Sequence, residues 1–191
     1  MALEFKKPEI KLKDVESKEA QHSEKKERLN PFASQECIDI LNFRIEQEEL
    51  SSRLYQAMSL WLNDHGFMGA AKAWLKDAEG EMEHAQWAKD FLLDMGIQPR
   101  LSTLITPTQT FEGLCDIIEQ SYVHEIMVTQ QCNDLAKHAM QYGNHLLYQL
   151  AIKYLQEQQE ELGKIQTLID KLEAFGEDKV ALRLLDNELG Q

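Results

Sequence analysis

Six polar residues fall at positions of this sequence where helical periodicity predicts buried apolar side chains. They are Glu48, Glu81, His84, Glu125, Gln158 and Glu161. Burying four carboxylates is very unfavourable unless protons or cations neutralise them, and two divalent metal ions would supply that charge. Glu81 and His84 lie three residues apart, as do Gln158 and Glu161, so each pair can reach one ion from a single helix. The pattern predicts a buried site for two metal ions.

The donor types in this set favour iron. Carboxylates suit both Fe(II) and Fe(III), and a single imidazole helps to fix the geometry. Carboxylates can also change between bridging and terminal binding, whereas a thiolate-rich site would bind metal more tightly and release it poorly. We therefore expect a redox site that both takes up and releases iron.

These residues require four long helices packed side by side. Apolar residues recur at steps of three and four through the segments 34–63, 67–92, 114–139, 147–172 and 180–189. Each long helix of about 28 residues would span roughly 42 Å, with its candidate ligands near the middle. Residues 97–111 contain two prolines and show no helical period, which suits a crossing from one end of a bundle to the other. We predict an all-α four-helix bundle with a long crossover between its second and third helices and a short fifth helix.

The N-terminal segment differs from the rest of the chain. Residues 1–33 are rich in lysine and glutamate and have few apolar residues, so we predict a polar extension before a single domain at 34–191. Mixed-sign charges allow a surface helix at 15–29. The extension is either a solvated tail or a docking segment.

Charge and cysteine usage narrow the functional classes. The net charge is −13, made up of +1 in residues 1–28 and −14 in residues 29–191. This acidity argues against nucleic acid or an anionic membrane as the main partner. Cys37, Cys115 and Cys132 are scattered and odd in number, as expected for reduced thiols in the cytoplasm. The sequence has no segment typical of a signal peptide or a membrane span. We expect a cytoplasmic protein.

Several motifs resemble those of bacterial non-haem ferritins. The similar stretches cover residues 50–59 (LSSRLYQAMS), 69–71 (GAA), 81–84 (EMEH) and 124–125 (HE), and the resemblance extends over about residues 36–190. It implies a ferritin-like bundle with a first iron site at Glu48, Glu81 and His84. The second site would use Glu81 as a bridge together with Glu125 and Glu161, with Gln158 beside it. Tyr55 would hydrogen-bond the site and supply an electron, or serve simply as a core tyrosine.

The resemblance also implies an activity and an assembly. Such a protein would be a ferroxidase that binds two iron ions per subunit, oxidises Fe(II) with O₂ or H₂O₂, and deposits ferric mineral inside a cage of 24 subunits. The acidic body would then concentrate Fe(II) on the inner surface, although it also serves solubility.

The sequence departs from related families at three points. Haem-binding bacterioferritins carry a second Glu-x-x-His motif where this chain has Gln158 and Glu161, which argues against haem. Met82 matches the position that holds haem in those proteins, but is more simply a packing residue. Glu157 and Glu160 match two ligands of a third, weaker iron site of the family. The acidic residue that completes this site in the family is replaced here by Gly80. Glycine inside a helix costs about 1 kcal/mol relative to alanine, which indicates close packing or a functional compensation.

Other functions of the same bundle remain alternatives. A rubrerythrin-like peroxidase would need a Cys-x-x-Cys pair, which this sequence lacks. A Dps-type cage would place its ligands between subunits rather than within one bundle. A non-catalytic ferritin-like shell or scaffold protein would be favoured by the loss of a ligand, and none of the proposed ligands is missing.

Overall fold

The computed structural model describes residues 34–176 and 178–191. Its helices are α2 (Gln35–Asp64), α3 (Met68–Asp94), α4 (Leu114–Gln141), α5 (His145–Phe175) and α6 (Lys179–Leu189). The described residues contain no strand. The predicted all-α fold and all five predicted helices are therefore confirmed. The predicted extension and its surface helix at 15–29 lie outside the described residues.

Local sequence signals set the helix boundaries. The Ser34 hydroxyl accepts a hydrogen bond from the Cys37 N–H at 3.3 Å and caps the start of α2. The Asn144 side chain caps α5 in the same way, through the Leu147 N–H at 3.0 Å. Gly143, at φ 63°, takes the left-handed conformation that separates α4 from α5. Gly143 and the Asn144 cap thus separate α4 from α5 between the two segments that the sequence predicted as helices.

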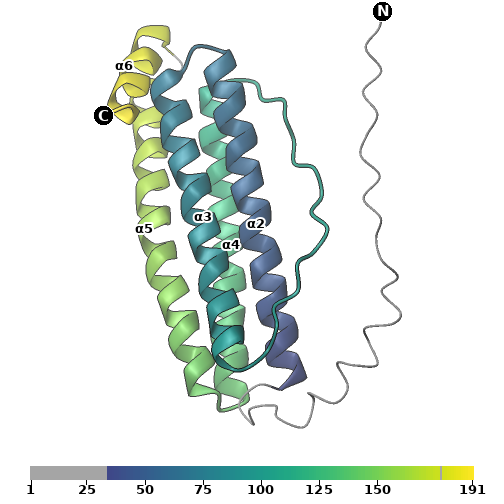
Figure 1. The fold of residues 1–191 in the computed structure, drawn as a ribbon. Coiled ribbons are helices and arrows are strands. Elements are labelled where there is room, and N and C mark those ends of the chain that lie inside the picture. The colour runs from purple at the N-terminus through teal and green to yellow at the C-terminus, as the bar shows by residue number, and fades with distance from the viewer. Residues whose placement is uncertain (1–33, 177) are drawn as a thin grey trace, which may run out of the picture.

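The four long helices form two antiparallel pairs joined by the crossover (Figure 1). Helix α2 packs on α3, and α4 packs on α5. The segment from α3 to α4 runs the length of the bundle along the outside of α2 (Figure 1). The backbone N–H of Arg100 donates to Asn42 Oδ1 at 2.7 Å, and its guanidinium pairs with Asp39 at 2.8 Å. These contacts hold the crossover against α2. Because the crossover returns the chain to the other end of the bundle, α3 and α4 run in the same direction (Figure 1).

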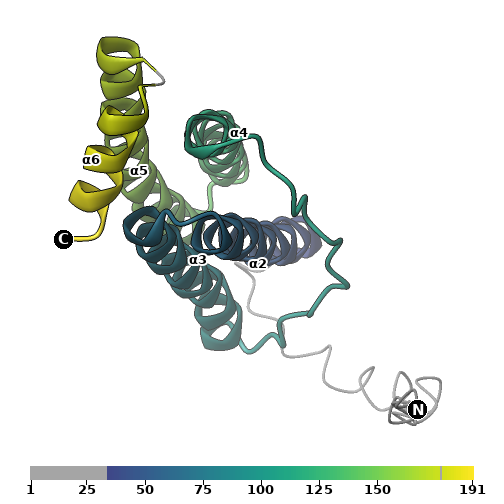
Figure 2. The same cartoon turned by 90° about the horizontal axis from the view of Figure 1, so that it is seen from above.

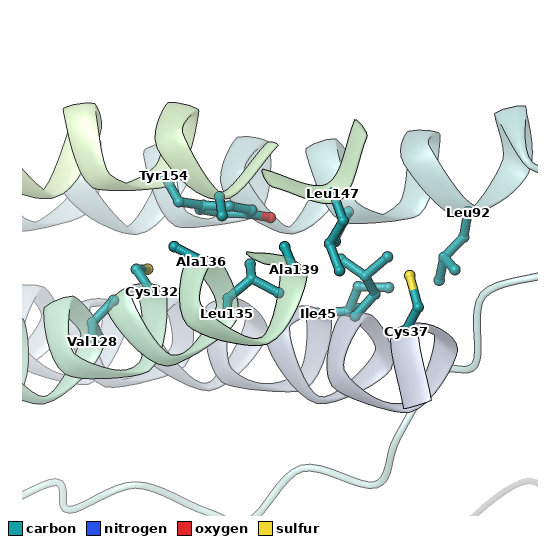
Figure 3. Packing of buried hydrophobic residues seen from close by; sticks show 13 residues of the cluster. Cys37, Ile45, Leu92, Val128, Cys132, Leu135, Ala136, Ala139, Leu147 and Tyr154 are labelled. Atoms are coloured by element: carbon teal, nitrogen blue, oxygen red, sulfur yellow. The ribbon is translucent and has the colours of Figure 1, made fainter. Parts of the chain in front are cut away.

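The core consists of two hydrophobic clusters, one toward each end of the bundle. The first includes Cys37, Ile45, Leu92, Leu135, Leu147 and Tyr154 (Figure 3). The second includes Met58, Leu62, Trp74, Ile117 and Ile165. The predicted ligands lie between these clusters along all four helices. Apolar packing above and below thus encloses a polar layer in the middle of the bundle.

Helix α6 packs at one end of the bundle, beside α3 (Figures 1 and 2). The buried Asp186 carboxylate accepts hydrogen bonds from the N–H groups of Gly69 and Ala70, at 2.8 and 2.9 Å, and so caps α3. A Cβ atom at Gly69 would lie 1.8 Å from the Asp186 carbonyl oxygen, so this approach requires glycine. Arg183 pairs with the second Asp186 oxygen at 2.9 Å. The charge of Asp186 is therefore compensated on both sides.

Two further expectations concern cysteines and membranes. Cys37, Cys115 and Cys132 form no disulfide within the described residues, and Cys37 and Cys132 are buried. Burial raises the pKa of Cys132 to about 12, so its thiol is neutral. None of the described helices has the length and apolar character to cross a membrane.

Candidate metal centre

Glu48, Glu81 and His84 come together in the polar layer between the two hydrophobic clusters. Glu48 is presented by α2, and the other two project from the same face of α3 because they are three residues apart. One ligand atom from each lies within 4.8 Å of the others, and all three side chains are buried. His84 Nδ1 is 3.1 Å from Glu81 Oε2. Two carboxylates and one imidazole thus converge at a distance that one metal ion can span.

The electrostatics of this group favour cation binding. Burial raises the pKa of Glu48 to about 8, although the nearby Arg44 guanidinium opposes the shift. Burial, followed by the charge of Glu125, raises the pKa of Glu81 to about 8 as well. Both carboxyls therefore hold protons at neutral pH that a divalent cation would displace.

A second polar group, around Glu125 of α4, adjoins the first. The Tyr55 hydroxyl donates a hydrogen bond to Glu125 Oε1, and the Gln158 amide donates to Glu125 Oε2 at 2.7 Å. Burial, then the charge of Glu125, raises the pKa of Tyr55 well above its ordinary value, so the phenol keeps its proton. The neighbouring His124 is held 2.8 Å from the Ser51 hydroxyl, and burial lowers its pKa to about 4. Tyr55 and Gln158 thus fix the orientation of the Glu125 carboxylate.

Glu161 lies at the margin of the site. Its side chain is half-buried and pairs with Lys164 Nζ at 2.7 Å. Glu161, Glu125 and Tyr55 all line a small cavity of about 50 Å³, together with Asp77. Two ligands of the predicted second site, Glu125 and Glu161, therefore share one cavity, and Glu81 is not among the residues that line it. In this structure Glu161 is engaged by a lysine. Its role as a ligand stays a prediction.

The sequence reasoning missed three charged residues close to these ligands. Arg44 contacts Glu48 at 2.7 Å, Lys164 contacts Glu161, and Asp77 lines the cavity. Burial raises the pKa of Asp77 to about 6, with Glu161 adding to the effect. Arg44 and Asp77 each lie four residues before a predicted ligand, so helical spacing alone would have placed them on the buried face.

The residues matching the weaker third site lie on the outer side of the first group. Glu157 Oε1 is 3.9 Å from His84 Nε2, while Glu160 is exposed. A Cβ atom built at Gly80 meets no heavy atom of the described residues within 4 Å. Close packing therefore does not explain this glycine, and the suggestion that it does is wrong.

Met82 and the tryptophans have different surroundings. Met82 is 44% exposed on α3 and belongs to neither hydrophobic cluster, so its role as a packing residue at a helix–helix contact stays a prediction. Trp74 is buried and donates to the Ser121 hydroxyl at 3.0 Å. Trp87 packs beside His84, with ring centroids 4.6 Å apart, and carries Lys153 Nζ 3.6 Å from its own ring centre. It therefore covers one side of the candidate histidine ligand.

Comparisons with known proteins agree with this geometry. A family described as a ferritin-like domain matches residues 38–175. The bacterial non-heme ferritin of Escherichia coli O6:H1 is 36% identical over 154 residues, covering 81% of this chain and 93% of that protein. A probable bacterial non-heme ferritin-like protein of Haemophilus influenzae is 31% identical over 157 residues, covering 82% and 95%. The crystal structure of an open pore ferritin from Archaeoglobus fulgidus matches with a TM-score of 0.81 at 30% identity, covering 83% of this chain and 97% of that one.

Proposed function

This chain belongs to the ferritin family, and on that premise we propose that it stores iron by oxidising Fe(II) at an internal two-iron centre. Family membership itself supports the iron-storage role. The chemistry at the centre is our proposal. It rests on one observation above all, the convergence of Glu48, Glu81 and His84 within a buried polar layer.

The three converging residues supply the first iron site. Two carboxylates neutralise the charge of one Fe(II), and the imidazole adds a neutral donor. Because the carboxyls hold protons at neutral pH, binding iron releases protons rather than exposing buried charge. The site therefore favours an incoming cation over an empty, ionised state.

The second iron site would be built by Glu81 as a bridge, with Glu125 and Glu161. Tyr55 and Gln158 hold the Glu125 carboxylate through two hydrogen bonds, which supports a fixed ligand position. To bind iron, Glu161 would have to leave Lys164. The lysine side chain is 60% exposed, so water can solvate its ammonium group when the ion pair breaks. A loosely held Glu161 suits a ligand that moves as iron arrives and leaves.

Two iron ions held side by side match the electron requirement of the oxidant. Each Fe(II) gives up one electron, so a pair supplies the two electrons that reduce O₂ to H₂O₂ or H₂O₂ to water. The protonated Tyr55 lies at the edge of this layer and would orient Glu125, or supply a further electron where O₂ is reduced beyond H₂O₂. The ferric product would leave for mineral growth.

The proposal extends to assembly and location. We expect a cage of 24 subunits in the cytoplasm, with its excess of acidic groups drawing Fe(II) inward. We expect neither haem, nucleic acid nor membrane as a partner. Light scattering should give a mass near 24 times the 22.1 kDa of one chain. A stable dimer or dodecamer would contradict this assembly.

Rapid mixing of the chelator-treated protein with two Fe(II) per subunit in air tests the chemistry. The absorbance of ferric species should rise in a fast phase that nearly vanishes in Glu81→Ala, since that residue is the proposed bridge. His84→Ala, which affects the first iron alone, should lose less of the phase. Circular dichroism controls for folding. A Glu81→Ala variant as fast as the parent would refute the two-iron centre.

A non-catalytic shell remains the second candidate, because two proposed ligands are already paired with cations. Arg44 contacts Glu48 and Lys164 contacts Glu161. If these pairs prevent iron binding, the cage would form without the fast oxidation phase. An anaerobic Fe(II) titration that finds no stoichiometric uptake would favour this function over the ferroxidase.

A further inference from the structure

Arg44 is a cation built into the polar layer of the bundle. Its side chain is only 2% exposed, and Nε lies 2.7 Å from Oε1 of Glu48, which is itself 1% exposed. The two residues are one helical turn apart on α2. A guanidinium keeps its charge at any pH at which proteins fold, so this positive charge is permanent.

The contacts of Arg44 differ from those of an arginine that serves stability alone. Nη1 donates to Gln131 Oε1 at 2.7 Å and approaches Cys132 Sγ at 3.9 Å. Nε faces Glu48 Oε1 at 2.7 Å as an ion pair without the alignment of a hydrogen bond. Nη2 has no hydrogen-bond acceptor among the described residues, and Glu48 Oε2 has no donor. Buried N–H groups without acceptors destabilise a fold, and even well-paired buried ion pairs contribute little to stability. The arrangement instead leaves one Glu48 oxygen held by Arg44 and the other open to a further cation.

This fixed charge alters the balance of the centre. Four carboxylates neutralise two Fe(II), so Arg44 adds one positive charge that the loaded site does not compensate. We propose that Arg44 is a positioning residue of the two-iron centre, which holds one oxygen of Glu48 and competes with iron for that carboxylate. The inference rests on the proposed function. Its consequence is weaker retention of metal at the first site than the ligands alone would give.

The competition acts more strongly on the product than on the substrate. Electrostatic repulsion grows in proportion to the charge of the ion, so Arg44 repels Fe(III) about 1.5 times as strongly as Fe(II). A centre that must pass ferric ions on to a mineral gains from that difference. Arg44 thus favours release of the oxidised product over its retention.

Zinc binding tests the charge effect without any redox step. Isothermal titration of the chelator-treated full-length protein with Zn(II) compares the parent with Arg44→Gln and Arg44→Met, two neutral variants of different shape. Both should bind Zn(II) at least about tenfold more tightly, because the repulsion between the buried guanidinium and the incoming dication is removed. Arg44→Lys keeps the charge and should stay near the parent. Arg53→Gln removes an exposed arginine from the same helix and should change nothing.

The outcomes separate this inference from the proposed function. Equal or weaker Zn(II) binding by the folded neutral variants would overturn the role of Arg44 and leave the centre intact. Adding Glu81→Ala to Arg44→Gln should abolish the tight binding, which ties the measurement to this site. If neither the parent nor any variant bound Zn(II), the proposed centre itself would fail, and the inference with it.

A second measurement follows the ferric product. After one round of aerobic oxidation, a second addition of Fe(II) should regain the fast phase sooner in the parent than in Arg44→Gln. Arg44→Lys should restore the rapid recovery, which a purely structural role of the guanidinium would not predict. A recovery time that is identical in the parent and both neutral variants would overturn the preference for ferric release.

Discussion

Glu81→Gln should weaken metal binding and strengthen the fold at the same time. The residue is buried next to Glu48, and burial raises its pKa to about 8. In the metal-free protein at pH 7, native Glu81 therefore keeps a proton that the unfolded chain has released. Glutamine has nearly the same shape and carries no such titration. Its amide can also keep a hydrogen bond to the Glu48 carboxyl, with which Glu81 interacts in the parent.

The size of the effect follows from the two pKa values. Each pH unit by which a carboxyl is forced to stay protonated costs about 1.4 kcal/mol. Between the ordinary pKa of 4.5 and pH 7 this amounts to about 3 kcal/mol for Glu81, as an upper limit. For a domain of this length the melting temperature should rise by at most roughly 10 °C. Loss of a ligand should meanwhile lower Zn(II) affinity by more than about 100-fold, since even supporting residues around a metal cost 10- to 100-fold.

The assay needs three readouts on one preparation. Thermal unfolding followed by circular dichroism reports the stability of the chelator-treated protein at pH 7. Isothermal titration with Zn(II) reports its metal affinity, and stopped-flow absorbance reports oxidation of the first Fe(II) added. Glu83→Gln is the matched control, because Glu83 is exposed on the same helix. This control substitution should leave both the melting temperature and the oxidation rate unchanged. A Glu81→Gln variant that is less stable than the parent, or oxidises iron as fast, would refute the reasoning from burial.

Three further perturbations test other parts of the structure. Glu48 and Glu81 hold more protons in the native metal-free protein than in the unfolded chain between about pH 5 and pH 8. The free energy of unfolding measured in urea should therefore fall as pH rises through that window. A flat profile would contradict the raised pKa values. Asp186→Ala removes the acceptor of two buried N–H groups at the start of α3. It should lower the free energy of unfolding in urea titrations by about 2–4 kcal/mol. An unchanged urea midpoint would mean that the contact between α6 and α3 does not stabilise the fold. An added Cβ at Gly80 meets no heavy atom of the described residues within 4 Å, and this position lies one helical turn before His84, which approaches Glu157 at 3.9 Å. Zn(II) titration of Gly80→Glu should therefore find one additional ion per subunit, whereas unchanged stoichiometry would argue against a third site there.

The helices and most of the site were predictable from the sequence because helical geometry is local. A residue three or four positions from another lies on the same face of a helix whatever surrounds it. That rule placed Glu81 beside His84 and put Glu48 on the buried face of α2, and the structure brings these three together. Capping residues and glycines are equally local signals, which is why the helix ends were predicted closely.

Only the tertiary structure decided how deeply each charged residue is buried. Glu161 and Glu48 look alike in the sequence, yet one is half-buried beside an exposed lysine and the other is enclosed with Arg44. Those differences depend on how the helices pack and on the rotamers that the packing selects, neither of which helical period encodes. The pKa values follow from the same packing, because burial is their largest cause. The sequence therefore determined which residues could form a metal centre, and the packing of four helices decided how deeply each ligand and its neighbouring cation is buried.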